Sequence, residues 1–189
     1  MLWRYSQASC WLWQLEQVWS CRGIFGFRRR RCYDTTVKIT ILYATYSNST
    51  YTAAEVLSEE LQQIGHEVAV SQVSTATAQT LTDSELTIFA SPSWDYEGKE
   101  GQPHEDFFHF FNKLADTTPP IPFIFAILAL GDSNYTYFCG AAEEIATMAT
   151  AAAGKQLGEA LKLDQYYLNE TACVASIKSW AKQLSELTA

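Results

Sequence analysis

The sequence predicts an α/β fold in which a doubly wound, five-stranded parallel sheet carries helices on both faces. Runs rich in β-branched and aliphatic residues alternate with helical patterns along most of the chain, which is typical of such sheets. The run at 122–130 has no charged residue, as expected of a central strand. No apolar run reaches the roughly 18–20 residues that a membrane-spanning helix needs.

Five segments have the composition of strands. The first is apolar on both faces apart from Lys38 and Thr40, as in a central parallel strand. The second alternates in the manner of a more exposed strand, and the fifth is the weakest. In chain order, the strands are expected at 37–44, 67–72, 86–90, 122–130 and 156–163.

Helical periodicity separates these strands. The pattern at 51–64 ends at Gly65, and Gly154 is expected to end a later helix in the same way, because glycine tolerates the left-handed backbone of a helix terminus. A polar, Thr-rich stretch at 74–83 is expected to form a loop or a short helix. The longer helices are expected at 51–64, at 104–115 with Phe107, Phe108, Phe111 and Leu114 buried, at about 138–153, and at 174–187.

Composition divides the chain near residue 37. Residues 1–37 hold six Arg against two carboxylates, a balance of +4, whereas residues 38–189 hold seven Lys against nineteen carboxylates, a balance of −12. The acidic part repels nucleic acid and anionic membranes and favours basic partners. The five Cys form no CxxC pair, so neither a disulfide framework nor a zinc site is indicated, and a reducing cytoplasm is expected.

The Trp- and Arg-rich extension at 1–36 has three open interpretations. It is a disordered tail, an artefact of the assigned gene start with Val37 as the true start, or a membrane-surface anchor. The basic cluster Arg28–Arg31 follows the apolar part rather than preceding it, which argues against a secretory signal. Residues 37–189 are expected to form the globular domain.

Three loops are expected at one edge of the sheet, since 45–50, 91–101 (within a longer loop at 91–103) and 131–137 follow the first, third and fourth strands. Ligands of open α/β sheets bind at that edge. The first loop is rich in hydroxyls and leads into a helix, where backbone N–H groups and the helix dipole hold phosphate. An ordinary Ser/Thr-rich helix cap is the alternative interpretation. The absence of a nearby Lys or Arg excludes the GxxxxGK[ST] loop of nucleotide triphosphatases.

The other two loops carry aromatic side chains. Trp94 lies on a polar loop with little core to enter, so it is expected to form one wall for a flat heterocycle, with folding back over the sheet edge as the alternative. Tyr135 is a second possible wall, with the carboxylate of Asp132 close by.

These loops resemble those of the short-chain flavodoxins. The stretch Thr45–Thr50 is similar to the phosphate loop [TS]-x-[TS]-G-x-T, the stretch SPSWD at 91–95 to the tryptophan-bearing loop, and LGDSNY at 130–135 to the third flavin loop. The resemblance covers 37–189 and implies the strand order 2-1-3-4-5.

The resemblance also implies a non-covalently bound flavin mononucleotide (FMN). The first loop would hold its phosphate, while Trp94 and Tyr135 would flank the inner and outer faces of its ring. No catalytic residue and no metal ligand is expected, and Cys139 is expected to have a packing role. The residues implied at the FMN site are Thr45, Tyr46, Ser47, Asn48, Ser49, Thr50, Pro92, Ser93, Trp94, Asp95, Leu130, Gly131, Asp132, Tyr135, Phe138 and Cys139.

Two positions depart from the family pattern. Asn48 stands where glycine is usual, but asparagine tolerates a left-handed backbone, so the loop is expected to form. Asp95 stands where many members have glycine, and its side chain is expected to weaken stabilisation of the one-electron-reduced flavin. The acidic residues Asp95, Glu97 and Asp132 would lower the last reduction potential by disfavouring an anionic ring.

The function implied by the resemblance is that of a low-potential electron carrier rather than an enzyme. It would act as a cytoplasmic monomer between a reductase and an acceptor with basic docking faces, without nucleic acid or membrane association. Two alternatives stay open: an FMN-dependent NAD(P)H quinone or flavin reductase, and a flavin-free binding module that Asn48 would permit. A phosphoacceptor regulator is excluded, because it needs acidic residues where Tyr43, Ala44 and Thr45 stand.

Overall fold

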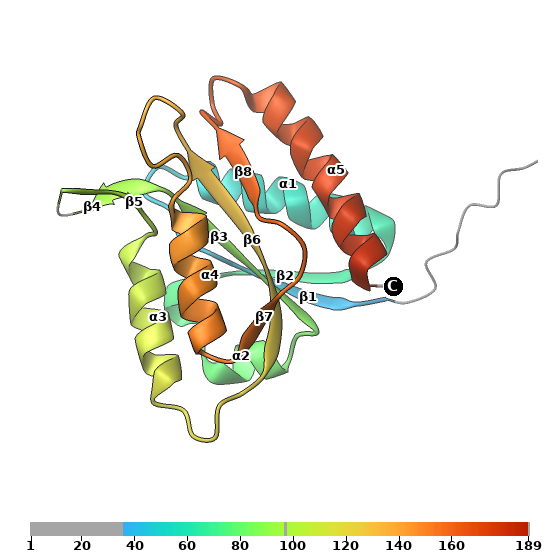
Figure 1. Cartoon of the computed structure of the whole chain (residues 1–189). Helices are drawn as coiled ribbons and strands as arrows, with labels where there is room; N and C mark the ends of the chain where they lie inside the picture. The colour runs from blue at the N-terminus through green and yellow to red at the C-terminus, as the bar shows by residue number, and fades with distance from the viewer. Residues whose placement is uncertain (1–35, 97, 189) are drawn as a thin grey trace, which may run out of the picture. The chain divides into compact units, whose positions relative to one another are not determined.

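A parallel sheet forms the centre of the computed structural model, which describes residues 36–96 and 98–188. The extension predicted at 1–36 lies outside the described residues apart from its last residue, and so does Glu97. The strand order is β2-β1-β3-β6-β7, with β8 also paired to β6, and every neighbouring pair is parallel (Figure 1). The predicted strand order is thereby confirmed. The strands are β1 (Lys38–Tyr43), β2 (Glu67–Gln72), β3 (Leu86–Pro92), β6 (Phe123–Gly131), β7 (Gly154–Gln156) and β8 (Leu161–Asp164).

Helices cover both faces of the sheet. The pair α1 (Ser49–Ile64) and α5 (Glu170–Thr188) packs on one face, and the pair α3 (Glu105–Ala115) and α4 (Ala141–Ala151) packs on the other (Figure 1). The 3₁₀ turn η1 (Val73–Thr75) and the short α2 (Ala78–Thr82) follow β2.

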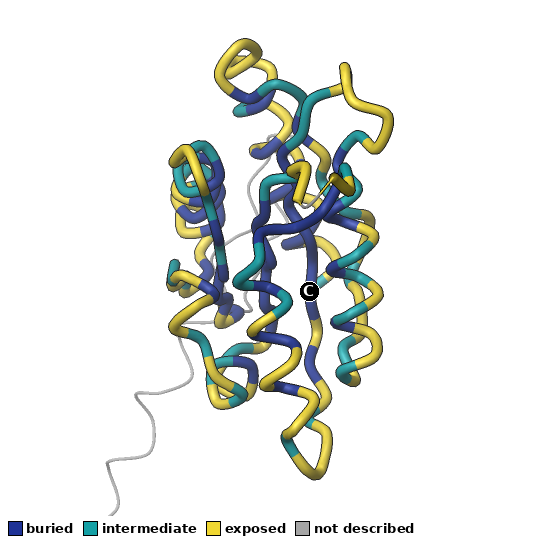
Figure 2. The backbone as a smooth tube through the Cα atoms, turned by 90° about the vertical axis from the view of Figure 1, so that its left-hand side faces the viewer, coloured by how far each residue is buried: buried dark blue, intermediate teal, exposed yellow. Residues whose placement is uncertain are grey.

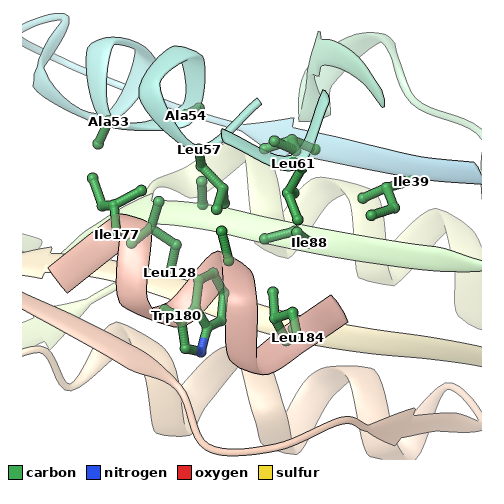
Figure 3. Packing of buried hydrophobic residues seen from close by; sticks show 14 of the residues in the cluster. Ile39, Ala53, Ala54, Leu57, Leu61, Ile88, Leu128, Ile177, Trp180 and Leu184 are labelled. Carbon is green, nitrogen blue, oxygen red and sulfur yellow. The ribbon is translucent and has the colours of Figure 1, made fainter. Parts of the chain in front are cut away.

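Each sheet face has its own hydrophobic core, because neighbouring residues of a strand point to opposite faces. Ile88 and Leu128 belong to the core beneath α1 and α5, where Leu57, Ile177 and Trp180 meet them (Figure 3). Figure 2 shows the buried residues following the strands, with exposed residues on the loops and outer helix surfaces. The opposite core, beneath α3 and α4, includes Leu42, Phe89, Phe107, Phe111 and Ile127.

The predicted fifth strand is two short strands, which corrects the expectation for 156–163. β7 pairs with β6 at Phe123–Phe125, and β8 pairs with it further along at Leu128–Gly131. Gly158 lies between them with a φ of 68°, so the chain leaves the extended conformation there. Gly154 begins β7 rather than ending α4, and an added Cβ would meet Ala149 O at 2.7 Å. Close packing therefore accounts for this glycine.

Two further expectations are corrected in the segment after β3. The expected loop at 91–103 contains an antiparallel hairpin, β4 (Trp94–Tyr96) and β5 (Lys99–Gln102), with Gly98 at φ 78° in its turn. In α3 the predicted stripe is wrong at one position: Phe110 is buried and Phe108 only partly so. The buried set follows the i, i+3, i+4, i+7 spacing that starts at Phe107, which is the period of a helix face.

Candidate functional site

The loop between β1 and α1 has the features of an anion site. Asn48 occupies the N-cap position with φ 70° and ψ −7°, so it adopts the left-handed conformation expected of it. Its carbonyl accepts the first helical hydrogen bond, from Thr52 N at 3.0 Å. The first turn of α1 contains no acidic residue, so its unsatisfied N–H groups and positive dipole end are not already matched by a carboxylate.

Two threonine hydroxyls of this loop lack a partner. Thr45 Oγ1 and Thr50 Oγ1 are buried and make no hydrogen bond within the described part of the chain. Leaving such a group unsatisfied costs about 1–3 kcal/mol, so buried hydroxyls are normally paired. A phosphate monoester could accept from both hydroxyls and from the helix N–H groups. The residues present therefore fit the phosphate of FMN.

Tyr46 joins this loop to the start of α3. Its ring stacks on the His104 ring, with centroids 4.2 Å apart, and lies 5.5 Å from the Trp94 ring. Its hydroxyl donates a hydrogen bond to the Glu105 carboxylate. Burial, followed by the interaction with Glu105, raises the pKa of Tyr46, and the hydrogen bond from Tyr46 lowers the pKa of Glu105. Tyr46 thus stays a protonated donor, and Glu105 an ionised acceptor.

The two predicted ring walls are exposed and stand on different loops. Trp94 in β4 is 56% exposed and Tyr135 is 58% exposed, and both line the same cavity. Both side chains are more than half exposed, so neither is buried in the core. The turn before Trp94 is fixed from both sides: Ser93 N donates to Leu130 O at 2.6 Å, and Ser93 Oγ accepts from Ala141 N at 3.1 Å.

The third loop is held by its own carboxylate. Asp132 Oδ1 accepts from Asn134 N at 2.8 Å and from Gln165 Nε2 at 2.9 Å. These hydrogen bonds, the backbone one foremost, lower the pKa of Asp132. Asp132 is therefore a negative charge at the cavity at neutral pH, and it shares that place with Asp95 and Glu100. No Lys or Arg of the described residues lines the cavity.

The three loops enclose a cavity of about 700 Å³ at the carboxyl ends of β1, β3 and β6, within the range of small-molecule sites. Some of the predicted site residues do not line this cavity, namely Thr45, Asn48, Thr50 and Phe138. Phe138 instead lines a neighbouring cavity between the β4–β5 hairpin and α4. The predicted site residues that line the main cavity are Tyr46, Ser47, Ser49, Pro92, Ser93, Trp94, Asp95, Leu130, Gly131, Asp132, Tyr135 and Cys139.

Two parts of the lining were missed by sequence reasoning. One is the tip of the hairpin and the residue facing it, namely Gly98, Glu100, Gly101 and Tyr137. The other is the segment after β8, which follows a fifth strand that ends at the same sheet edge. A pair of adjacent tyrosines directly after that strand was the available signal. This second part consists of Gln165, Tyr166, Tyr167 and Leu168.

Cys139 lines the cavity as a packing residue. It is buried, has a φ of 52°, and its Sγ lies 3.6 Å from Ala129 O. Burial raises the pKa of its thiol to about 12, so the nucleophilic thiolate is not formed at neutral pH. This agrees with the packing role expected from the sequence. Among the described residues there is no cluster of His, Cys, Asp and Glu suited to a metal ion.

Comparison with known proteins identifies the family. The sequence model of the family described as Flavodoxin matches residues 41–176. The chain belongs to the flavodoxin family. Flavodoxins bind FMN and transfer electrons, and they are not enzymes. The fold and cofactor implied by the sequence motifs are thereby confirmed at the level of the family.

Individual flavodoxins are similar over most of their length. The flavodoxin of Nitratidesulfovibrio vulgaris is 28% identical over 127 residues, which cover 67% of this chain and 84% of that protein. The flavodoxin of Maridesulfovibrio salexigens is 27% identical over 128 residues, which cover 67% and 86%. The crystal structure of oxidised Flavodoxin 2 from Bacillus cereus superimposes with a TM-score of 0.68 at 23% identity, covering 79% of this chain and 98% of that one. This structure shares the fold.

In the part of the chain that the structure describes, no helix is both long and apolar enough to cross a membrane.

Proposed function

We propose that this flavodoxin is a low-potential electron carrier and that the cavity at 45–50, 92–96, 98–101 and 130–139 is its FMN site. The observation that carries the proposal is that a polar feature and an aromatic feature lie at the same edge of the sheet. The buried hydroxyls of Thr45 and Thr50 have no partner within the described residues and could donate to a phosphate, and the exposed rings of Trp94 and Tyr135 could stack on a flat apolar ring. FMN carries both, joined by a flexible chain.

Bound FMN supplies the one-electron redox chemistry. The residues would bind and orient it: the hydroxyls and N–H groups of 45–50 would hold the phosphate, while Trp94 and Tyr135 would flank the ring and exclude water from it. Backbone groups of Asp95, Leu130 and Asp132 would meet the polar edge of the ring. Phe138 lines the neighbouring cavity rather than this one, so we propose no direct contact of its side chain with FMN.

The low potential is proposed from the charges at the cavity. Asp95, Glu100 and Asp132 line it, and no basic residue of the described chain offsets them there. Negative charge beside the ring opposes a further negative charge on it, most strongly where water is excluded. A fully reduced anionic ring would therefore be disfavoured, which would make the protein a stronger reductant.

The partners are proposed from the same charge pattern. Residues 38–189 carry a balance of −12, so basic docking faces on a reductase and on an acceptor would be steered to the cavity. A transient, salt-sensitive encounter suits a monomer that exchanges partners, and the cytoplasm is the proposed compartment.

The test is the visible spectrum of the purified protein, followed by identification of the acid-released cofactor and a redox titration. A yellow protein that releases FMN and whose second one-electron potential lies below that of free FMN is expected. A colourless protein that takes up no added FMN would overturn the proposal in favour of a flavin-free binding module. Steady-state NAD(P)H oxidation by the protein alone would favour the reductase alternative.

A further inference from the structure

The segment after β8 reaches across the cavity to the phosphate loop. Tyr167 Oη donates a hydrogen bond to Ser47 O at 3.1 Å, although the two residues are 120 positions apart. Both residues line the cavity. This bond joins the turn before α5 to the turn before α1, so it links the segment after β8 to the phosphate loop at the site.

Tyr167 is presented by a turn that is itself fastened. Leu168 N donates to Gln165 O at 2.8 Å, and Gln165 N donates to Gly131 O at 2.9 Å. Gln165 has a φ of 45°, a left-handed conformation that is uncommon outside glycine and asparagine. The Asp164 carboxylate accepts from both Ser133 N and Ser133 Oγ at 2.8 Å. The turn that carries Tyr167 is therefore hydrogen-bonded to β6 and to the third loop.

The bond fixes one peptide plane of the phosphate loop. Since the Ser47–Asn48 peptide is planar and trans, a fixed Ser47 carbonyl also fixes the direction of the Asn48 N–H. Asn48 is the N-cap of α1 and has a left-handed backbone conformation. The orientation of the Ser47–Asn48 peptide plane therefore sets the direction in which the chain enters α1. Tyr167 also occupies a carbonyl oxygen that would otherwise add an unpaired negative dipole beside an anion.

We propose that Tyr167 is a positioning residue that makes the cavity select phosphorylated flavin over flavin without a phosphate. The inference rests on the proposed FMN site. A flavin that lacks the phosphate makes no use of an ordered loop at 45–50, so only the phosphorylated form gains from the bond. The side chain of Tyr167 is 59% exposed and its ring meets Tyr166, with centroids 5.7 Å apart, so removal of the hydroxyl leaves this ring contact in place.

The test compares FMN with riboflavin, which has the same ring and no phosphate. In Tyr167→Phe, the dissociation constant of the apoprotein for FMN should rise about three- to tenfold, as expected for one lost hydrogen bond, while that for riboflavin stays unchanged. Flavin fluorescence quenching gives both constants. Hydrogen exchange of the amides at 48–50 in the apoprotein should become faster.

The matched control is Tyr51→Phe. Its hydroxyl bonds to Glu55 on the same helix and its side chain does not line the cavity, so neither dissociation constant should change. Equal weakening of FMN and riboflavin in Tyr167→Phe, or no change in either, would overturn the inference while leaving the FMN site intact. A wild-type apoprotein that binds neither flavin would overturn the proposed function and this inference together.

Discussion

The two ends of the cavity are built in different ways. The phosphate loop is held between two tyrosine hydroxyls, since Tyr46 donates to Glu105 on one side and Tyr167 donates to Ser47 on the other. The ring end consists of Trp94 and Tyr135, which are more than half exposed and stand on separate loops. Both ends lie at the same sheet edge, so their difference comes from side-chain contacts rather than from the fold.

This difference separates two tasks of a cofactor site. A loop that is ordered before the ligand arrives loses little entropy on binding, which favours affinity. The exposed side chains of Trp94 and Tyr135, on two separate loops, can adjust to the flavin ring and to a docking partner, and they leave the edge of the cavity open. We therefore expect changes at the phosphate end to discriminate between flavins with and without phosphate. Changes at the ring end should affect both flavins alike.

The largest effect is expected from Thr50→Val at the phosphate end. The change removes a buried hydroxyl that has no partner in the part of the chain that the structure describes, and it keeps the shape of the side chain. FMN affinity should fall about thirtyfold, as for a lost hydrogen bond to a charged group, while riboflavin affinity stays the same. The apoprotein should become more stable in urea unfolding, because an unsatisfied buried group is gone.

The control for Thr50→Val is Thr87→Val. Thr87 Oγ1 is also buried without a partner within the described chain, but it lies in β3, whereas Thr50 lies in the first turn of α1 at the phosphate loop. This variant should gain stability and keep its affinity for FMN. A similar loss of FMN affinity in both variants would show that the hydroxyl of Thr50 does not contact the phosphate.

A smaller effect is expected from Trp94→Ala at the ring end. The dissociation constants for FMN and riboflavin should both rise about tenfold, since an aromatic stacking contact is lost in both complexes. The free energy of unfolding of the apoprotein should change little, because Trp94 is 56% exposed. Tyr96→Ala is the matched control, as Tyr96 is an exposed aromatic residue of the same hairpin outside the cavity lining. A change in the ratio of the FMN and riboflavin dissociation constants would contradict the proposed difference between the phosphate end and the ring end.

The phosphate end and the ring end also differ in how much of each could be predicted from the sequence. The phosphate loop was predictable because strand, hydroxyl-rich turn and helix are adjacent in sequence, and strand order brings the other loops to the same edge. The hairpin of Trp94 was not, since it depends on left-handed turns at Gly98 and Gly101 and not on alternating apolar residues. The bond from Tyr167 to Ser47 spans 120 residues, so no local pattern contains it.

The opposite edge of the sheet offers a pH test that should leave both ends of the cavity unaffected. His66 is buried, its Nδ1 accepts from Val37 N at 3.3 Å, and its Nε2 lies 2.9 Å from Ser185 Oγ. Burial lowers the pKa of His66. The folded state therefore binds fewer protons than the unfolded state below the unfolded pKa of about 6.5, so stability should fall as the pH drops from there toward the lowered pKa.

The measurement is urea unfolding of the apoprotein between neutral and mildly acidic pH. The loss of stability should be smaller in His66→Gln, which cannot titrate, than in the wild type. His109→Gln, at an exposed position of α3, is the control and should keep the wild-type dependence. The ratio of FMN to riboflavin affinity in His66→Gln should equal that of the wild type. An unchanged pH dependence in His66→Gln would show that another group governs the acid transition.

The smallest effect is expected from Asp95→Gly, which alters the ring end without removing a wall. Asp95 lies in β4 between the exposed Trp94 and Tyr96, and it is not among the described residues with a positive φ. Glycine would open positive-φ conformations to this peptide, so its carbonyl could turn toward the ring when the ring gains a proton. The first one-electron potential of the bound flavin should therefore rise.

The variant Asp95→Asn separates this backbone effect from charge. Both variants remove the carboxylate, so both should raise the second potential by relieving repulsion at the ring. Only Asp95→Gly should widen the gap between the first and second potentials beyond that of Asp95→Asn, as followed by spectroelectrochemical titration. FMN and riboflavin affinities should shift together in each variant, because position 95 lies at the ring end. An equal gap in the two variants would mean that the backbone of Asp95 is not what limits the one-electron-reduced state.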